Sequence, residues 1–316
     1  MSEISVVMNV GQLPIDWLRQ SVESILRQTF TNLEFIIICD TPTNKDIIAL
    51  LKDYAAQDHR IVMVFNEGKL GVPKSINKGL RIAQGKFIAR MDADDISEKR
   101  RLEEQYAFME ANDDVVLLGS NVHFIGQNAF LKLTDNIQYD DRSIKAQMLL
   151  GNCIAQSSVL IRKKTLDENH LLYDESIKCC EDYRLWEQMM PFGKFACLEE
   201  KLVSHRLSEL QISKHLRDEM KLNTDIIRVR LQLAWLKRNG YTSFTANDLM
   251  HDAVSVLSLL RKNPKVNDTP EYKAFLQYVY LVSKDRNKNL FTPFLNGDIQ
   301  HITKWNIARL IKRSVC

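Results

Sequence analysis

The first hundred residues alternate short apolar runs with amphipathic stretches, and this alternation constrains the fold more than any other feature of the sequence. Four runs predict strands, at residues 4–10, 33–39, 61–65 and 86–91. Three of them are apolar almost throughout, as is usual for strands that helices cover on both faces. Strand and helix units in alternation therefore predict an α/β fold with a mostly parallel central sheet flanked by helices.

Helices are predicted between these runs and after them. The first would bury Leu18, Val22, Ile25 and Leu26, and the second Ile76, Leu80 and Ala83. We expect the second helix to end at Gly85, because glycine commonly follows the last helical turn. A third helix, with Leu102, Tyr106 and Met109 on one face, would be capped by Ser97.

The length of 316 residues exceeds what one hydrophobic core usually fills, so we expect a large domain with a smaller one appended. Residues 115–119 and 157–162 predict further strands, whereas the chain looks helical and more basic after about residue 214. The predicted division is one domain over residues 1–215 and a helical C-terminal extension over residues 216–316.

Composition excludes several classes of protein. Hydrophobic residues make up 45% of the chain and charged residues 26%, which is ordinary for a soluble globular protein. The net charge of +3 is too small to indicate nucleic acid, and no nucleic-acid partner is expected. The sequence has no apolar run of about 18 residues and no signal-peptide pattern, which predicts a cytoplasmic protein. The six cysteines lack metal-site spacing, so we expect reduced thiols.

Three aspartates, Asp92, Asp94 and Asp95, follow the fourth apolar run within four positions. Open parallel sheets bind ligands beyond the carboxyl ends of their strands, and Asp40 holds the equivalent place after the second run. Carboxylates this close raise one another's pKa unless a cation or strong donors hold them. A bound Mg²⁺ or Mn²⁺ is the simplest way to relieve this repulsion. Such an ion is usually held by one or two carboxylates together with the phosphates of a nucleotide diphosphate.

Other interpretations of these aspartates compete. An acidic cluster before a helix can simply complement the positive end of the helix dipole, and a D-x-D pattern can arise by chance. A calcium loop of the EF-hand type is excluded, because Ile96 and Ser97 stand where that loop needs an oxygen ligand and glycine.

A second acidic pair, Glu181 and Asp182, precedes a segment whose apolar spacing predicts a helix packed on the core, with Leu185, Trp186 and Met189. By itself the pair could be only an N-terminal helix charge. Together with a metal-binding acidic loop, however, a separate carboxylate can deprotonate an incoming hydroxyl while the metal polarises a leaving diphosphate.

Between about residues 3 and 213, several segments in the same order along the chain resemble the family 2 inverting glycosyltransferases of the GT-A fold, in particular bacterial enzymes that build lipopolysaccharide and capsule. These segments are ISVVMNV, SVESILRQTFTNLEFIIICD, NEGKLGVPKSINKGLRIAQGKFIARMDADD, NCIAQSSVLIRK, EDYRLW and VSHRLSELQIS. The resemblance implies that residues 1–215 form a GT-A catalytic domain. It also implies transfer of a sugar from a nucleotide-sugar, expected to be a UDP-sugar, to a hydroxyl of a glycan or lipid-linked oligosaccharide.

The resemblance also implies roles for single residues. Asp94 would ligate the metal, and Asp182 would be the general base of a single inverting displacement. The nucleotide-sugar would lie against Val10, Asp40 at the base, Asp92 near the ribose, and Arg90 and Arg206 near the diphosphate. For Arg90, a structural ion pair is the competing interpretation.

The sequence departs from the family pattern at two places that matter. Gln156 stands where histidine is common, and Ser208 stands where the family often has a histidine that contacts metal or phosphate. Metal ligands beyond Asp94 therefore stay open. Two other functions also stay open, a sugar nucleotidyltransferase and a non-catalytic partner in a glycan-assembly complex.

Two C-terminal segments, residues 225–241 and 302–316, mix Leu, Ile and Trp with Arg and Lys. This composition suits a helix that rests on an anionic membrane surface, and lipid-linked acceptors would make such contact useful. We therefore include peripheral association with the inner face of the plasma membrane as a hypothesis. Packing of these helices on the catalytic domain is the competing interpretation.

Overall fold

The computed structural model describes residues 2–127, 129, 139–209, 215–251 and 253–286. The chain divides into two compact units, Met1–Trp235 and Leu236–Cys316. Helix α9 (Arg217–Arg238) begins in the first unit and ends in the second. The predicted division into domains at residues 215 and 216 stays a prediction.

The parallel half of the sheet is formed by the four strands predicted near the N-terminus. These are β1 (Ile4–Val10), β2 (Leu33–Cys39), β3 (Ile61–Phe65) and β4 (Phe87–Asp92). β1 pairs in parallel with β2 and β4, and β2 pairs in parallel with β3. The predicted parallel sheet is confirmed in this half of the fold.

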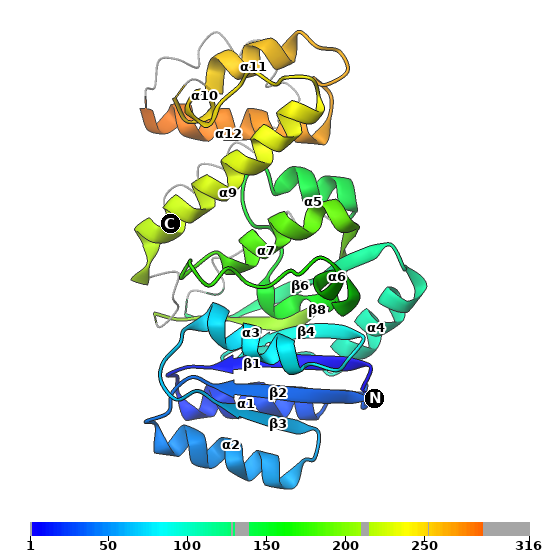
Figure 1. The fold of residues 1–316 in the computed structure, drawn as a ribbon, viewed down its shortest axis with the longest axis vertical. Helices are drawn as coiled ribbons and strands as arrows, with labels where there is room; N and C mark the ends of the chain where they lie inside the picture. Colours follow the sequence, from blue (N-terminus) through cyan, green and yellow to red (C-terminus); the bar gives the residue numbers. More distant parts are fainter. Residues whose placement is uncertain (1, 128, 130–138, 210–214, 252, 287–316) are drawn as a thin grey trace. The chain divides into compact units, whose positions relative to one another are not determined.

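Helices cover both faces of this half, as the apolar strands predict. Figure 1 shows α1 (Ile15–Leu26) and α3 (Val72–Ile82) on opposite faces. Leu18, Val22 and Ile25 of α1 belong to a buried cluster with Val6 and Met8 of β1. On the other face, Gly79 of α3 lies against Val7 and Ile38, close enough that a Cβ would clash at 2.7 and 2.9 Å.

Beyond β4 the sheet becomes mixed. Its further strands are β7 (Leu160–Arg162), β6 (Val115–Gly126), β8 (Lys194–Leu207) and β5 (Ile96–Ser97), in the full order β3-β2-β1-β4-β7-β6-β8-β5. β7 is antiparallel to β4 and β6, β6 is parallel to β8, and β5 is antiparallel to β8. The sequence does not reveal β8, because the strand's register shifts at the exposed charged residues Glu199, Glu200 and Lys201.

Besides α1, α3 and α9, the described residues of the first unit form the helices α2 (Lys45–Gln57), α4 (Arg101–Ala111), α5 (Asp141–Gln147), α6 (Lys163–Glu168) and α7 (Glu181–Met189). The helix predicted after Asp182 is confirmed as α7, with Leu185, Trp186 and Met189 buried. The described residues of this unit also include short 3-10 helices at Gln156–Ser158 and Met190–Phe192.

Two predicted helix boundaries are wrong. α3 ends at Ile82 rather than Gly85. A Cβ at Gly85 would lie 2.5 Å from the backbone nitrogen of Ser5, so glycine is needed there for close approach to β1 rather than as a helix cap. Ser97 lies in β5, where its backbone N–H donates to Ser24 Oγ, and α4 begins only at Arg101.

The described residues of the second unit are helical, as predicted. They form the end of α9, α10 (Ala246–His251), α11 (Ala253–Arg261) and α12 (Pro270–Arg286), around buried side chains such as Leu249, Val256, Leu260 and Phe275. Among the described residues, no helix is both long and apolar enough to cross a membrane. The basic segment 302–316 lies outside the described residues, and Ile227, Val229 and Leu231 of the other segment are buried.

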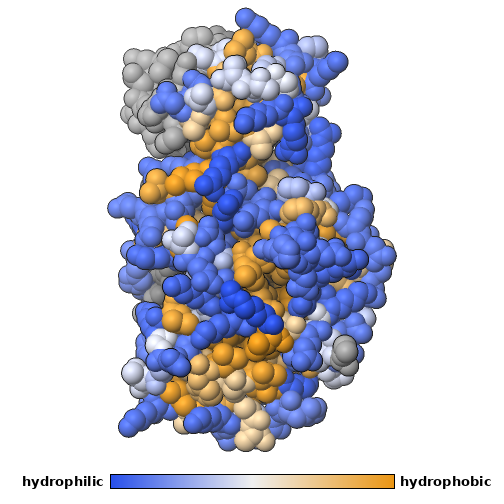
Figure 2. All heavy atoms as spheres, viewed as in Figure 1, coloured by the Kyte–Doolittle hydropathy of each residue, from blue (hydrophilic) through white to orange (hydrophobic). Residues whose placement is uncertain are grey.

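β3 is an edge strand that exposes apolar side chains. Val62 and Phe65 are exposed, and Leu70 in the following loop is exposed as well. Figure 2 shows apolar side chains gathered over the part of this unit that contains β2, β3 and α2 in Figure 1. Lys52 of α2 reaches over the Phe65 ring, 5.8 Å from its centroid, and places a charge beside this edge.

We predict that Gly85→Ala destabilises the fold by about 1–3 kcal/mol, because the added methyl group must push the β1 backbone away. Gly68→Ala is the matched control, since nothing lies within 4 Å of a Cβ at Gly68. The control should change the free energy of unfolding by less than about 0.5 kcal/mol. Urea denaturation of both variants measures the difference, and equal stabilities would contradict the assigned role of Gly85.

Candidate active site

The carboxyl ends of β1, β2 and β4 meet at one edge of the sheet and bring several predicted site residues there. Val10 ends β1, Asp40 follows β2, and Asp92 ends β4. These three strands are adjacent and parallel, so the loops after them share one edge. This edge is where we place the candidate active site.

Asp92 is held by two neighbours. Its Oδ1 accepts a hydrogen bond from Arg90 Nη2 at 3.1 Å, and its Oδ2 accepts one from Ser157 Oγ at 2.8 Å. Arg90 is completely buried and also donates to the carbonyl oxygen of Val7. Of the two interpretations of Arg90, a phosphate contact or a structural ion pair, these contacts are those of a structural ion pair.

Asp95 is fully buried and ties the acidic turn to strand β8. Its Oδ1 accepts from the backbone N–H of Arg206 at 2.8 Å, and its Oδ2 lies 2.9 Å from His205 Nδ1. Burial alone would lower the pKa of His205. The hydrogen bond to Asp95 and the charges of the three aspartates outweigh burial and raise that pKa above the ordinary value for histidine.

Asp94 differs from both neighbours. In the part of the chain that the structure describes, its carboxylate receives no hydrogen bond from another residue. Burial, together with the charges of Asp95 and Asp92, raises the pKa of Asp94 to about 7. Its backbone oxygen accepts from Arg206 Nε at 2.7 Å, which fixes the turn beside the carboxylate. Asp94 is thus the aspartate of the cluster that is available to a ligand.

Arg206, predicted near the diphosphate, is placed against the acidic turn. Besides contacting Asp94, it donates through Nη2 to Gln20 Oε1 at 2.7 Å, and its guanidinium lies 4.9 Å from the centroid of the Trp17 ring. Arg206 therefore lies beside Asp94 through the backbone oxygen of that residue, and its contact with a diphosphate stays a prediction.

Asp182 lies in the first turn of α7, with Asn152 Nδ2 donating to its Oδ2 at 2.6 Å and the Tyr183 N–H to its Oδ1 at 2.7 Å. Burial raises the pKa of Asp182 to about 6, the two hydrogen bonds oppose this, and the charge of Asp92 adds to it. Burial and the charge of Asp182 raise the pKa of Glu181 to about 8. A protonated Glu181 at neutral pH relieves the repulsion that would otherwise hinder ionisation of Asp182.

Asp40 and Val10 lie at the same edge but not in the acidic cluster. Asp40 is buried, and its carboxylate accepts hydrogen bonds from Asn66 Nδ2 at 2.8 Å and from the backbone N–H groups of Leu70 and Gly71 at 2.7 and 2.9 Å. Val10 is buried, and its carbonyl accepts from the Asp40 N–H. Asp40 thus organises the loop that leads into α3, and a direct contact with a base stays a prediction.

Several residues of the site had no assigned role from the sequence. Ser157 and Asn152 each hold a site carboxylate, and Asn66 links Asp40 to Lys78, whose Nζ donates to Asn66 Oδ1 at 2.9 Å. Short polar side chains carry little signal by themselves, because serine and asparagine are ordinary loop residues. Ser157 and Asn152 do lie in the segment NCIAQSSVLIRK, which resembles the family, and this was the available signal.

The donor set fits a divalent cation held jointly with a substrate. Among the described residues, no group of three or more His, Cys, Asp or Glu side chains is arranged to hold a metal by itself. Mg²⁺ and similar ions commonly take one or two protein carboxylates and complete their shell with phosphate oxygens and water. Asp94 supplies one carboxylate of that kind.

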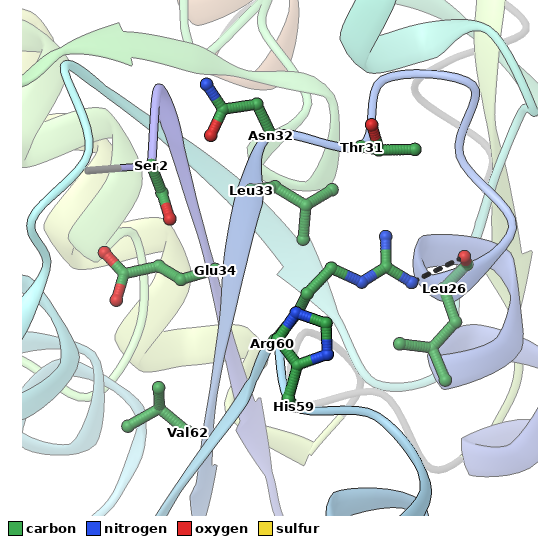
Figure 3. A pocket seen from close by; sticks show the side chains of 9 residues that line it. All are labelled: Ser2, Leu26, Thr31, Asn32, Leu33, Glu34, His59, Arg60 and Val62. Atoms are coloured by element: carbon green, nitrogen blue, oxygen red, sulfur yellow. Dashed lines mark hydrogen bonds between the residues drawn. The ribbon is translucent and has the colours of Figure 1, made fainter.

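A pocket of about 600 Å³ lies elsewhere, at the amino ends of β2 and β3. Figure 3 shows Arg60 within it, hydrogen-bonded to the carbonyl oxygen of Leu26. The charged groups of this pocket are already paired, because Arg60 binds Asp58, and Glu34 accepts from Ser5 Oγ and the Gln84 N–H. The pocket lies at the edge opposite to the one where parallel sheets bind ligands, and it contains none of the predicted site residues.

Comparisons with known proteins bear on the family and the fold. Residues 5–169, just over half of the chain, match the family described as Glycosyl transferase family 2. An uncharacterized glycosyltransferase of Methanocaldococcus jannaschii is 38% identical over 206 residues, which cover 65% of this chain and 70% of that protein. The O-antigen biosynthesis glycosyltransferase WbnJ of Escherichia coli is 29% identical over 217 residues, covering 67% and 82%.

Two solved structures share the fold at low sequence identity. TarS of S. aureus in complex with UDP-GlcNAc aligns with a TM-score of 0.60 at 13% identity, over 91% of this chain and 93% of that one. The mannosyltransferase PcManGT from Pyrobaculum calidifontis, in complex with GDP-Man and Mn²⁺, aligns with a TM-score of 0.55 at 12% identity, over 90% and 88%. The chain belongs to glycosyl transferase family 2, and its fold is of the GT-A type.

Proposed function

We propose that this glycosyltransferase moves a sugar from a UDP-sugar to a hydroxyl of a surface glycan, such as a lipopolysaccharide, O-antigen or capsule chain, with inversion at the anomeric carbon. The observation that carries the proposal is that the site has two carboxylates in different surroundings. Asp94 is left available to a ligand, whereas Asp182 is a separate, half-buried carboxylate whose pKa is raised to about 6.

In this proposal Asp182 takes the proton from the acceptor hydroxyl as that oxygen attacks the anomeric carbon. A base works best when its pKa lies near the working pH, and a pKa of about 6 leaves most of Asp182 ionised at neutral pH. Asp94 would hold a divalent cation, Mg²⁺ or Mn²⁺, which would neutralise charge on the departing diphosphate. Asp92, at the end of β4, is ion-paired with the buried Arg90.

The choice of donor and acceptor draws on related proteins. TarS binds UDP-GlcNAc and PcManGT binds GDP-Man with Mn²⁺, so both take nucleotide-sugars. WbnJ is named for O-antigen biosynthesis, which favours a glycan or lipid-linked oligosaccharide as acceptor. A sugar nucleotidyltransferase would also bind a nucleotide diphosphate at this edge. The family match and the separately placed Asp182 favour transfer to a hydroxyl instead.

We predict that Asp94→Ala lowers sugar transfer at least about 100-fold, and that Asp182→Asn lowers it by about 100- to 10,000-fold while nucleotide binding persists. UDP release from a panel of UDP-sugars, with Mn²⁺ or Mg²⁺ and with or without glycan acceptors, measures both variants. Asp113→Asn is the matched control, because this exposed aspartate lies in the turn between α4 and β6, and it should keep full activity. Normal transfer by Asp182→Asn, or full turnover after exhaustive chelation, would refute the proposal.

The raised pKa of Asp182 predicts an acid limb in the rate of transfer. Because the base must be ionised, the rate should fall about tenfold for each pH unit below about 6 and level off above about 7. The measurement is kcat against pH at saturating donor, cation and acceptor, so that binding does not limit the rate. A limb near 4, the usual value for an exposed aspartate, would mean that burial does not tune this carboxyl.

We also propose that the chain acts in the cytoplasm, peripherally at the inner face of the plasma membrane, where lipid-linked acceptors would be presented. The basic and apolar composition of residues 302–316 supports this proposal. Sedimentation with anionic liposomes should show binding that is lost when residues 300–316 are deleted. Binding that survives the deletion would assign the contact to another surface.

A further inference from the structure

The carboxylate of Asp182 is held at both oxygens, and only one of the two donors belongs to its own helix. The Tyr183 N–H donates to Oδ1, while Asn152 Nδ2 reaches Oδ2 from a loop thirty positions earlier in the chain. A general base must point at the proton that it removes and must be ionised beforehand. The donor at Oδ2 bears on both requirements.

The orientation of the Asn152 amide is fixed by a second hydrogen bond. The backbone N–H of Ile154 donates to Asn152 Oδ1 at 3.1 Å, so the amide oxygen faces its own loop and the amino group faces Asp182. A flipped amide would set an oxygen against the carboxylate and lose both bonds. Asn152 therefore presents a donor to Asp182.

Helix α9 fixes both segments that carry this pair. Gln232 Nε2 and Arg228 Nη1 donate to the carbonyl oxygens of Leu149 and Leu150 at 2.9 and 3.1 Å, three and two residues before Asn152. Asn223 Nδ2 of the same helix donates to the carbonyl oxygen of Cys179 at 3.2 Å, two residues before α7 begins. Because a single helix holds the two segments, the distance from Asn152 to Asp182 is set from both sides.

We propose that Asn152 is a positioning residue that orients the carboxylate of Asp182 and keeps it ionised for proton abstraction. The inference rests on the proposed function, in which Asp182 is the base. A donor that binds the charged form of a carboxyl lowers its pKa, and it does so here against burial, which raises it. Without the donor, a larger share of Asp182 is protonated near neutral pH and cannot accept the hydroxyl proton.

Two substitutions separate this role from a structural one. Asn152→Asp keeps an oxygen for the Ile154 N–H and replaces the donor toward Asp182 with a second carboxylate oxygen. Asn152→Ala removes both bonds. Carboxyl-carbon NMR of the unliganded chain should show the pKa of Asp182 rising by about one unit in the alanine variant and further in the aspartate variant. Asn112→Ala is the matched control, because it removes a side-chain hydrogen bond to the Phe108 carbonyl oxygen away from the site. This variant should leave the pKa of Asp182 unchanged.

Activity supplies the second readout. In both Asn152 variants, transfer should fall several-fold more at about pH 6 than at about pH 8, because the acid limb moves upward. An unchanged Asp182 titration in the folded Asn152→Asp variant, or an equal loss of transfer at both pH values, overturns the inference. Full transfer by Asp182→Asn would instead refute the proposed function, while the NMR titration still reports whether Asn152 tunes the Asp182 carboxyl.

Discussion

Two fully buried guanidinium groups beneath the turn after β4 allow three aspartates to stand within four positions. Arg90 pairs directly with Asp92. Arg101 is also fully buried and donates to the carbonyl oxygens of Arg90 and Val159. Burial lowers the pKa of Arg101 to about 9, which still leaves it charged at neutral pH. These buried cations offset part of the mutual repulsion of the carboxylates, while burial and the charges of Asp95 and Asp92 still raise the pKa of Asp94 to about 7.

The hydrogen bonds and ion pairs that the protein makes with the cluster also distinguish its three aspartates. The carboxylate of Asp92 contacts Arg90 and Ser157, and that of Asp95 contacts His205 and the backbone N–H of Arg206. These contacts hold the acidic turn after β4 against its neighbouring segments. Asp94 alone of the three receives no such bond within the described part of the chain. In the proposed function, the metal that the sequence suggested for the whole cluster would bind only one of its carboxylates, that of Asp94.

The surroundings of Asp182, the proposed general base, depend on a helix that lies beyond the residues that match the family. Helix α9 begins at Arg217, whereas the family match ends at residue 169. Its side chains nevertheless hold the loop before Asn152 and the backbone before α7. The first compact unit extends to Trp235 and so includes these contacts. The geometry around Asp182 therefore belongs to the whole unit.

The sequence was sufficient for the strands of the parallel half, because continuous apolar runs such as residues 33–39 are buried on both faces wherever they pair. It also singled out the acidic residues at the carboxyl ends of β2 and β4, whose roles in binding and catalysis stay proposals. It missed β8, whose exposed charged residues at a register shift interrupt the apolar pattern, and it misplaced the roles of Gly85 and Ser97. Those roles depend on the β1 backbone and on Ser24, which are distant in the chain.

By itself, then, the sequence determined the order of strands and helices near the N-terminus, the family, and which carboxylates are candidates for the site, because periodicity and residue type are local properties. The tertiary structure alone decided which aspartate is available, which arginines are buried partners, and that Asn152 meets Asp182. Each of these depends on atoms that come together only when segments far apart in the chain pack against one another.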